Sequence, residues 1–400
     1  EVRSRGDLVI ETARAGTDTV WSYLTQLTLA DNVENGRIML DSSANMQGNA
    51  LDNALIAGAG DNVLNGSAGQ DTVSYASATA AVNVNLALTT AQNTGGSGND
   101  TLLNIENVTG SSFADQLTGN QKDNYFIDGA GADTLSGGAG NDVYEVHEFN
   151  DVIVEQASAG TDEIRSYIYN VFLADNVENA RIMLKGMAYL TGNALNNVLE
   201  SGVGDSVLKG DLGQDTASYV HAAAGVNANL ALTTAQNTGG SGFDTFFSIE
   251  NLTGSALADQ LTGDALDNRL SGGAGDDTLS GGAGHDRLTG GTGNDRFVLA
   301  DLSSDTLTDF VVGADKIALS AQVFTALAST NNAAERSLSA GRFVNTAQAA
   351  DSNDVVLYNA SSGALFYDAD GSGQAAAVQI ALIGTQTHPT LSAADFVIIA

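Results

Sequence analysis

The chain has no cysteine and a single proline among its 400 residues, and only 6% of them are aromatic. Without cysteine, disulfides and thiolate metal sites are excluded. No apolar run approaches the ~20 residues that span a bilayer, and the first segment, EVRSRGDLVIETARAGTD, has no hydrophobic core of a signal peptide. Because residue 1 is Glu and not Met, we expect a fragment or a processed product.

Basic residues are also scarce, with 15 Lys and Arg against 48 Asp and Glu, so the formal charge is -33. Repulsion of this size argues against nucleic acids and anionic membranes as partners. Many of the acids lie in glycine-rich turns, which indicates cations as their counter-charge. The 46 glycines and the 43% hydrophobic content favour a repetitive β structure with an apolar core over a disordered chain.

Three consecutive copies of one nine-residue unit occupy residues 272–298: GGAGDDTLS, GGAGHDRLT and GGTGNDRFV. Each copy has glycine at positions one, two and four, Asp at position six and an apolar residue at position eight. Glycine permits tight turns, while the carboxylate and the turn carbonyls offer hard oxygens to a cation. The apolar residue lies on a short strand that can point it inward. The pattern therefore predicts a calcium-binding solenoid.

A long duplication organises the chain. Residues 71–120 recur at 215–264 with 36 identities in 50 and no insertion. The offset is 144 residues, and two nonapeptides make a coil of 18, so the offset equals 8 × 18. A continuous solenoid requires a duplication that preserves the coil register. We therefore expect two modules, 1–144 and 145–298.

The composition changes after residue 298. Glycine becomes rarer and longer alternating runs appear, such as DTLTDFVVGADKIALS and VVLYNASSGALFYDADGSG. These runs predict a β-rich cap over residues 299–400, with one short helix around 321–328. A cap of this kind covers the open end of a solenoid.

The nonapeptides resemble the RTX (repeats-in-toxin) proteins that are exported by type I secretion. The resemblance implies an all-β fold, a right-handed parallel β-roll of GGxGxDxUx nonapeptides, in which several calcium ions each lie between one turn and the turn one full coil later. It implies metal ligands at the position-six aspartates and at the glycine turns of the three strongest repeats. These are Asp71, Asp100, Asp115, Asp133, Asp142, Asp215, Asp244, Asp259, Asp277, Asp286, Asp295, Gly272, Gly273, Gly275, Gly281, Gly282, Gly284, Gly290, Gly291 and Gly293.

The same resemblance distributes the ligands over two edges of the roll. Asp259, Asp277 and Asp295 are expected on one edge, and Asn268 with Asp286 on the other. Several turns depart from the pattern at position six. Asparagine stands there at 53, 62, 124, 197 and 268, and serine at 206. Because an amide lacks the charge of a carboxylate, we expect the tightest sites at 272–298 and 128–145.

The C-terminal part resembles the region that serralysin-type proteases share with large RTX adhesins, through LTDFVVGADKIALS, ALFYDADGSG and the final DFVIIA. This resemblance implies an uncleaved signal for the type I exporter at residues 395–399. The DADGSG segment is either a calcium loop or an ordinary Asp/Gly turn. An EF-hand would need Glu at its twelfth position, where Gln379 stands.

Catalytic motifs are missing from the sequence. The segment HEFND at 147–151 is not HExxH, and no serine lies in GxSxG, so we expect no catalytic residues and no protease activity in this chain. Trp21, Tyr23, Tyr167 and Tyr169 could form a sugar-stacking strip, but packing between strands is the favoured interpretation.

The expected function is that of a secreted, extracellular bacterial calcium-binding region, non-catalytic, that folds on calcium after export. In the cytosol, repulsion between carboxylates would keep the chain unfolded for the exporter, and calcium outside the cell would convert binding energy into folding energy. Two alternatives remain open at this point. The chain could be the secretion or polysaccharide-binding part of an enzyme of the protease, lipase or alginate epimerase type, or the calcium-stiffened stalk end of a surface adhesin.

Overall fold

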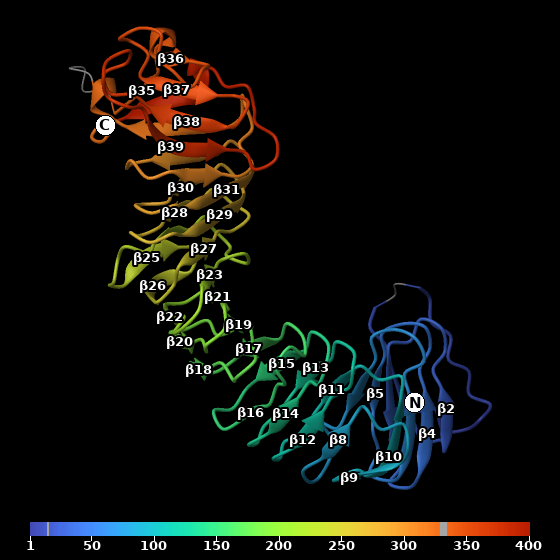
Figure 1. Ribbon diagram of the computed structural model, residues 1–400. Coiled ribbons are helices and arrows are strands. Elements are labelled where there is room, and N and C mark those ends of the chain that lie inside the picture. The colour runs from blue at the N-terminus through green and yellow to red at the C-terminus, as the bar shows by residue number, and fades with distance from the viewer. Residues whose placement is uncertain (14–15, 329–333) are drawn as a thin grey trace. The chain divides into compact units, whose positions relative to one another are not determined.

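The computed structural model describes residues 1–13, 16–328 and 334–400 (Figure 1). Within these residues the regular structure is almost entirely short β-strands, so the predicted all-β class is confirmed. The helix expected around 321–328 is a single 3-10 turn, η1 (Thr325–Leu327). Contacts divide the chain into two units. Unit 1 comprises residues 1–184 with 193–195, and unit 2 comprises 185–192 with 196–400.

Unit 1 is a parallel solenoid. Its first face consists of strands that each pair in parallel with the next: β1 (Thr19–Ser22), β3 (Asn35–Ile38), β5 (Ala54–Ile56), β7 (Thr72–Ser74), β11 (Asn107–Thr109), β13 (Tyr125–Ile127), β15 (Val143–Val146), β17 (Glu163–Ser166) and β19 (Asn179–Ile182). Its second face holds two parallel sets, β2 (Gln26–Thr28), β4 (Ala44–Gln47), β6 (Asn62–Asn65) with β10 (Gly98–Leu103), and β8 (Asn83–Asn85), β12 (Gln116–Thr118), β14 (Thr134–Ser136) with β16 (Val152–Ile153).

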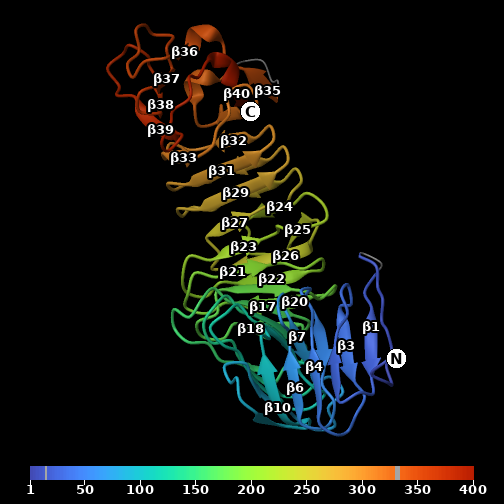
Figure 2. The ribbon, with the colours of Figure 1, turned by 90° about the vertical axis from the view of Figure 1, so that its right-hand side faces the viewer.

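Unit 2 repeats this arrangement (Figure 2). One face contains β21 (Val198–Glu200), β23 (Thr216–Ser218), β27 (Asn251–Thr253), β29 (Arg269–Ala274), β31 (Arg287–Thr292) and β33 (Asp305–Leu307), all paired in parallel. The other contains β20 (Ala188–Thr191), β22 (Ser206–Lys209) and β26 (Gly242–Phe247), followed by β24 (Asn227–Asn229), β28 (Gln260–Thr262), β30 (Thr278–Ser280), β32 (Arg296–Leu299) and β34 (Lys316–Ser320).

The register of the nonapeptide coils is the one that the sequence predicts. Gln116 pairs with Thr134 in unit 1, and Arg269 pairs with Arg287 in unit 2, so that in both cases the step between partners is one coil of two nonapeptides. The position-eight side chains point inward and are fully buried, as expected. In the strongest repeats these are Leu279, Leu288 and Phe297, each with 0% exposure. The apolar stack therefore supports the turns from inside.

The residues after 298 extend the two faces of unit 2 and then close them. Strand β40 (Phe396–Ile399) pairs in parallel with β34, and β39 (Val378–Ile383) pairs in parallel with β33. An antiparallel set, β37 (Val356–Asn359), β38 (Ala364–Tyr367) and β39, continues from there. The segment predicted to be an export signal is thus a buried strand at the end of the fold.

Each unit also interrupts its solenoid with an antiparallel hairpin. Strand β9 (Gln92–Gly95) pairs with β10 in unit 1, and β25 (Gln236–Gly239) pairs with β26 in unit 2. The hairpins occupy equivalent positions in the two copies of the duplication. They lengthen one coil, so that Gln116 pairs with Asn83, which lies nearly two nonapeptide coils earlier in the sequence.

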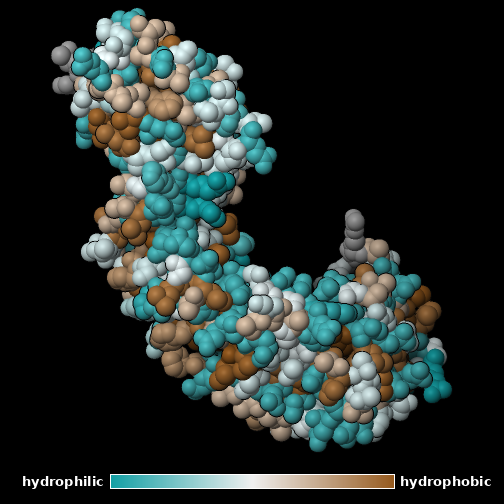
Figure 3. All heavy atoms as spheres, viewed as in Figure 1, coloured by the Kyte–Doolittle hydropathy of each residue, from teal (hydrophilic) through white to brown (hydrophobic). Residues whose placement is uncertain are grey.

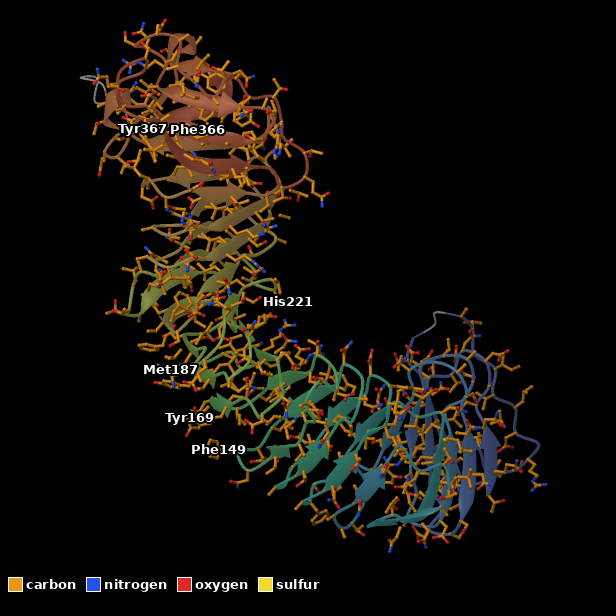
Figure 4. All side chains as sticks on the ribbon, viewed as in Figure 1. Phe149, Tyr169, Met187, His221, Phe366 and Tyr367 are labelled. Atoms are coloured by element: carbon orange, nitrogen blue, oxygen red, sulfur yellow. The ribbon has the colours of Figure 1, made fainter. Side chains whose placement is uncertain are left out.

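The aromatic residues expected to pack between strands behave differently from one another. Trp21 is 41% exposed, with the Arg37 guanidinium over its ring, and Tyr169 is 64% exposed and projects away from unit 1 (Figure 4). For these two residues the packing prediction is wrong, because Trp21 lies on the outward face of β1 and Tyr169 lies in the bend between β17 and β18 (Asn170–Phe172). Tyr167 instead stacks on His147 with ring centroids 4.5 Å apart. The visible surface is largely hydrophilic, with small separate apolar patches (Figure 3).

Candidate calcium-binding turns

The glycine turns of successive coils stack directly on one another. The backbone φ of Gly291 is +102°, a conformation that L side chains rarely adopt. A Cβ at this position would also overlap the carbonyl oxygen of Gly273, which lies one coil earlier. At Gly272 a Cβ would collide with the carboxylate of Asp277. Glycine at position one therefore leaves room for the aspartate at position six of the same turn.

The position-six aspartates form ladders between coils. In unit 2, Asp277 Oδ1 accepts a hydrogen bond from the backbone N–H of Asp259 at 2.8 Å, and Asp295 Oδ1 accepts one from Asp277 at 3.0 Å. In unit 1, Asp133 Oδ1 accepts from the N–H of Asp115 at 2.6 Å. Each of these bonds spans 18 residues. One carboxylate oxygen thus fixes the register of the coils and leaves the other for a different partner.

The second oxygen has no such partner in much of the ladder. Six predicted ligands have a buried Oδ2 without a hydrogen bond: Asp71, Asp133, Asp142, Asp215, Asp277 and Asp286. A buried polar atom without a partner is costly, and a buried charge without one is more so. A hard divalent cation satisfies such oxygens. The turns are therefore chemically suited to calcium, with the carboxylate oxygens already aligned along each edge.

Electrostatics point in the same direction. Burial, together with the nearby carboxylates of Asp259 and Asp295, raises the pKa of Asp277 to about 7. Burial likewise raises the pKa of Asp142 to about 7 and that of Asp286 to about 6. Near neutral pH these groups therefore resist ionisation in the fold. A bound divalent cation removes this resistance because it favours the charged carboxylate.

The predicted ligands Asp115 and Asp259 already have donors for both oxygens. Asp115 Oδ1 accepts from the N–H of Val82 at 2.7 Å and from the Ser111 hydroxyl, and its Oδ2 accepts from the N–H of Ser111. Asp259 has the same environment at the equivalent position of the duplication. Serine occupies the position of the second glycine in these turns. They therefore have a side-chain hydroxyl where the other turns have only backbone atoms.

Asp100 and Asp244 belong to a different environment. Asp100 Oδ2 accepts from the hydroxyls of Tyr75 at 3.0 Å and Thr94 at 3.2 Å. Asp244 Oδ2 accepts from the hydroxyls of Tyr219 at 2.8 Å and Thr238 at 2.9 Å. The tyrosines are fully buried. These two aspartates therefore hold the hairpins onto the core through hydroxyl donors, and calcium binding by them stays a prediction.

The ladders continue past the residues that sequence analysis selected. The N–H of Asp133 donates to Asp151 Oδ1 at 3.0 Å, and the N–H of Asp142 donates to Asp162 Oδ1 at 2.8 Å. In unit 2 the ladders end in the same way at Asp305 and Asp315. Asp151 keeps the 18-residue step and could have been found from it. The other three follow steps of 19 or 20 residues, which the strict nonapeptide period misses.

The comparison with protein families agrees with this geometry. Four stretches match the family described as RTX calcium-binding nonapeptide repeat: residues 47–77, 109–144, 191–218 and 253–297. The chain contains RTX calcium-binding nonapeptide repeats. Its parallel solenoid, its buried position-eight residues and its stacked glycine turns fit an RTX β-roll. A search of curated proteins finds no match.

The four matched stretches contain nearly all the predicted ligands, with Asp100 and Asp244 outside them. The region 299–400 also lies outside, so its serralysin-like character stays a prediction. In the part of the chain that the structure describes, no helix is long and apolar enough to cross a membrane.

Proposed function

We propose that this chain is a non-catalytic, extracellular calcium-binding region that folds when calcium binds after export by a type I exporter. The observation that carries the proposal is the set of six buried, unpartnered carboxylate oxygens in the turns. Without a cation, the folded chain keeps these oxygens buried and without hydrogen-bond donors. In the presence of a cation the same oxygens become ligands.

The charge of the chain supports the coupling of folding to calcium. With a formal charge of -33, the compact state concentrates negative charge that the unfolded chain disperses. Extracellular calcium modules bind with Kd values of about 10⁻⁴–10⁻³ M, well above cytosolic free calcium. The chain therefore stays unfolded inside the cell, as an exporter requires, and gains binding free energy outside. The lack of cysteine suits the same route.

The test is a calcium titration of the chelator-treated chain, followed by far-UV circular dichroism, with magnesium as the control. The proposal expects a cooperative gain of β signal at sub-millimolar to millimolar calcium and none with magnesium. A chain that is already β-rich in excess chelator would contradict folding on calcium. The export part of the proposal is tested by measuring secretion through a type I exporter of the chain with and without residues 395–399.

A second candidate function is the binding of an anionic polysaccharide. It is favoured by a polar hollow of about 500 Å³ in unit 2, lined by Arg269, Arg287 and His285 together with amide side chains such as that of Asn251 and one carboxylate, Asp267, whose Oδ1 accepts the N–H of His285 at 2.7 Å. The two arginines are neighbours in register on β29 and β31. Neither forms a salt bridge within the described part of the chain. Two free guanidinium groups can each bind a carboxylate through paired hydrogen bonds.

This second function is tested by calorimetry with a soluble polyuronate at fixed calcium, with a neutral glucan as the control ligand. The double variant Arg269→Ala with Arg287→Ala is expected to lose binding. Arg5→Ala, which removes an exposed arginine from unit 1, is expected to keep it. Equal binding by both variants would contradict a specific site in the hollow.

A further inference from the structure

The second face of unit 1 is interrupted between β16 and β18. Thr134 pairs with Val152 at the coil step of 18 residues, and the same step would place Asn170 next in the row. Instead β16 is the last strand of its set, and β18 belongs to a different sheet. On the first face the same coils stay joined, because β17 pairs with both β15 and β19. The solenoid is therefore open on one face only.

An apolar hollow of about 330 Å³ lies at this interruption. It is lined by Ile153 of β16 and by Val171 and Phe172 of β18. It also reaches Val146 and Ile164, which are 6% and 2% exposed. Its volume is at the lower end of the range of ligand pockets, about 300–1,000 Å³. The hollow therefore gives a molecule of matching shape access to the apolar core of unit 1.

The free edge of β16 offers backbone hydrogen bonds at the same place. Val152 and Val154 donate their N–H groups to the carbonyls of Asp133 and Leu135, both at 2.8 Å. Since the backbone groups of successive residues in a parallel strand point to alternate sides, the N–H and carbonyl of Ile153 point away from β14. The Ile153 side chain follows the fully buried Leu135 in the inward row but is itself only half-buried. A further strand would give Ile153 the hydrogen bonds and the packing of an inner position.

The hairpins show how this chain covers a similar edge. Strands β8 and β10 also belong to separate sheets. There β9 covers the edge of β8: the Asn85 N–H donates to Gln92 Oε1 at 2.7 Å, and Gln92 Nε2 donates to the Asn85 carbonyl at 3.0 Å. Asn229 and Gln236 repeat both bonds in unit 2. Ile153 has no such cap within the described part of the chain, so the edge of β16 is open to another molecule.

The rim of the hollow combines exposed aromatic side chains with negative charge. Phe149 and Phe172 line the hollow and are 58% and 63% exposed. Phe149 projects away from the ribbon of unit 1 (Figure 4). Grouped apolar side chains at the surface are typical of an interaction site. The charged residues of the lining are Glu148 and Asp151, and its described residues include no Lys or Arg. The hollow therefore fits a segment in which apolar residues alternate with basic ones.

We propose that this hollow binds an extended segment of a basic partner protein, which adds a strand to β16. Hydrogen bonds to Ile153 hold the backbone of the segment, and the hollow and Glu148 select its apolar and basic side chains. A second copy of this chain fits less well, because two copies with a formal charge of -33 each repel one another. An apolar small molecule leaves the backbone groups of Ile153 without hydrogen bonds. The proposal does not rest on calcium binding by the turns.

The test uses a fluorescein-labelled peptide, VKVKVK, and follows its binding to the full chain by fluorescence anisotropy. The buffer contains millimolar calcium, and circular dichroism first confirms that the chain is folded. We expect saturable binding of one peptide per chain. The peptide SKSKSK keeps the charge without the apolar side chains, and VKVKVK N-methylated at alternate residues keeps the side chains but lacks the N–H groups of one edge. Each of these controls is expected to bind about tenfold more weakly or worse.

The matching change in the chain is Phe149→Ser with Phe172→Ser, which removes apolar surface at the rim and leaves the buried core intact. Its affinity for VKVKVK is expected to fall by about tenfold or more. The control is Phe243→Ser with Phe247→Ser, which removes two side chains of β26 that are 52% and 46% exposed. It is expected to bind as the wild type does. Circular dichroism checks that both double variants are folded.

Three results would overturn the proposal. Equal affinity of the two double variants would mean that the overall negative charge alone attracts the peptide. Undiminished binding of the N-methylated peptide would mean that the hollow takes apolar groups without pairing of strands. A peptide-free chain that sediments as a dimer, and as a monomer after Phe149→Ser with Phe172→Ser, would make a second copy the occupant. A chain that is β-rich in chelator would instead overturn the proposed folding on calcium alone, because the binding assay requires only a folded chain.

Discussion

The replacement Asp277→Asn separates the structural role of a turn aspartate from its role as a calcium ligand. Asparagine keeps an oxygen that can accept the N–H of Asp259, which lies at 2.8 Å. It removes the charge, including that on the unpartnered Oδ2, with almost no change in volume. Asp277 is 1% exposed, so no new side-chain surface meets water. The effect of the change is therefore mainly electrostatic.

The sign of that effect should depend on calcium. Burial, followed by the negative neighbours Asp259 and Asp295, raises the pKa of Asp277 from 3.8 to about 7. At about 1.4 kcal/mol per pH unit this opposes the calcium-free fold by about 4 kcal/mol, which screening at the edge of the roll reduces to about 1–2 kcal/mol. Asparagine should stabilise the calcium-free fold by that amount. In calcium at tenfold Kd, it should forfeit about 1.4 kcal/mol of binding free energy.

The assay is equilibrium unfolding by denaturant, in chelator and in millimolar calcium, of the wild type, Asp277→Asn and Asp205→Asn. Asp205 is the control because it is exposed and its Oδ1 accepts the N–H of Phe243 at 2.9 Å, a bond that asparagine can keep. We expect Asp205→Asn to change the free energy of unfolding by less than about 0.5 kcal/mol in either buffer. If Asp277→Asn destabilises the fold equally with and without calcium, Asp277 only shapes its turn and the reasoning is refuted.

Three further predictions concern pH, turn stacking and the buried hydroxyls. Between about pH 4 and 7 the calcium-free fold should lose stability as pH rises, because the raised pKa of Asp277 makes the folded chain bind more protons than the unfolded one; thermal unfolding in chelator measures this. Gly291→Ala should cost about 2–3 kcal/mol more than Gly313→Ala by denaturant unfolding in calcium, since both have positive φ but only Gly291 abuts another coil. Equal costs would argue against direct stacking. Tyr219→Phe should cost about 1–2 kcal/mol in the same assay, because Asp244 loses a buried donor, and no loss would mean that the remaining donors suffice.

Much of the fold follows from local periodicity. Position eight of each nonapeptide had to point inward, and Leu279, Leu288 and Phe297 do so with no exposure. A coil of two nonapeptides predicts that paired residues on neighbouring strands lie 18 positions apart, and the pairing of Arg269 with Arg287 confirms this register. Both features depend only on the alternation of a strand and the freedom of a glycine turn. The sequence pattern was therefore sufficient for the architecture of the repeats.

The parts that escaped prediction depend on contacts at irregular separations. Tyr75 and Asp100 are 25 residues apart, and their hydrogen bond exists only because a hairpin lengthens the coil between them. The duplication offered a signal, since Tyr219 and Asp244 repeat the pair at the same separation. Asp162 escaped because an insertion shifts it out of the nonapeptide period. A pattern of fixed length does not detect ligands that an insertion brings into place.

The most direct test of calcium binding by the turns is a crystal structure of the chain grown in calcium, with anomalous scattering used to locate the ions. The account predicts ions on the edges of the roll, about 2.3–2.6 Å from the Oδ2 atoms of Asp277, Asp286 and Asp142. Turns without anomalous peaks, with these oxygens bridged by water or by protein donors instead, would contradict it.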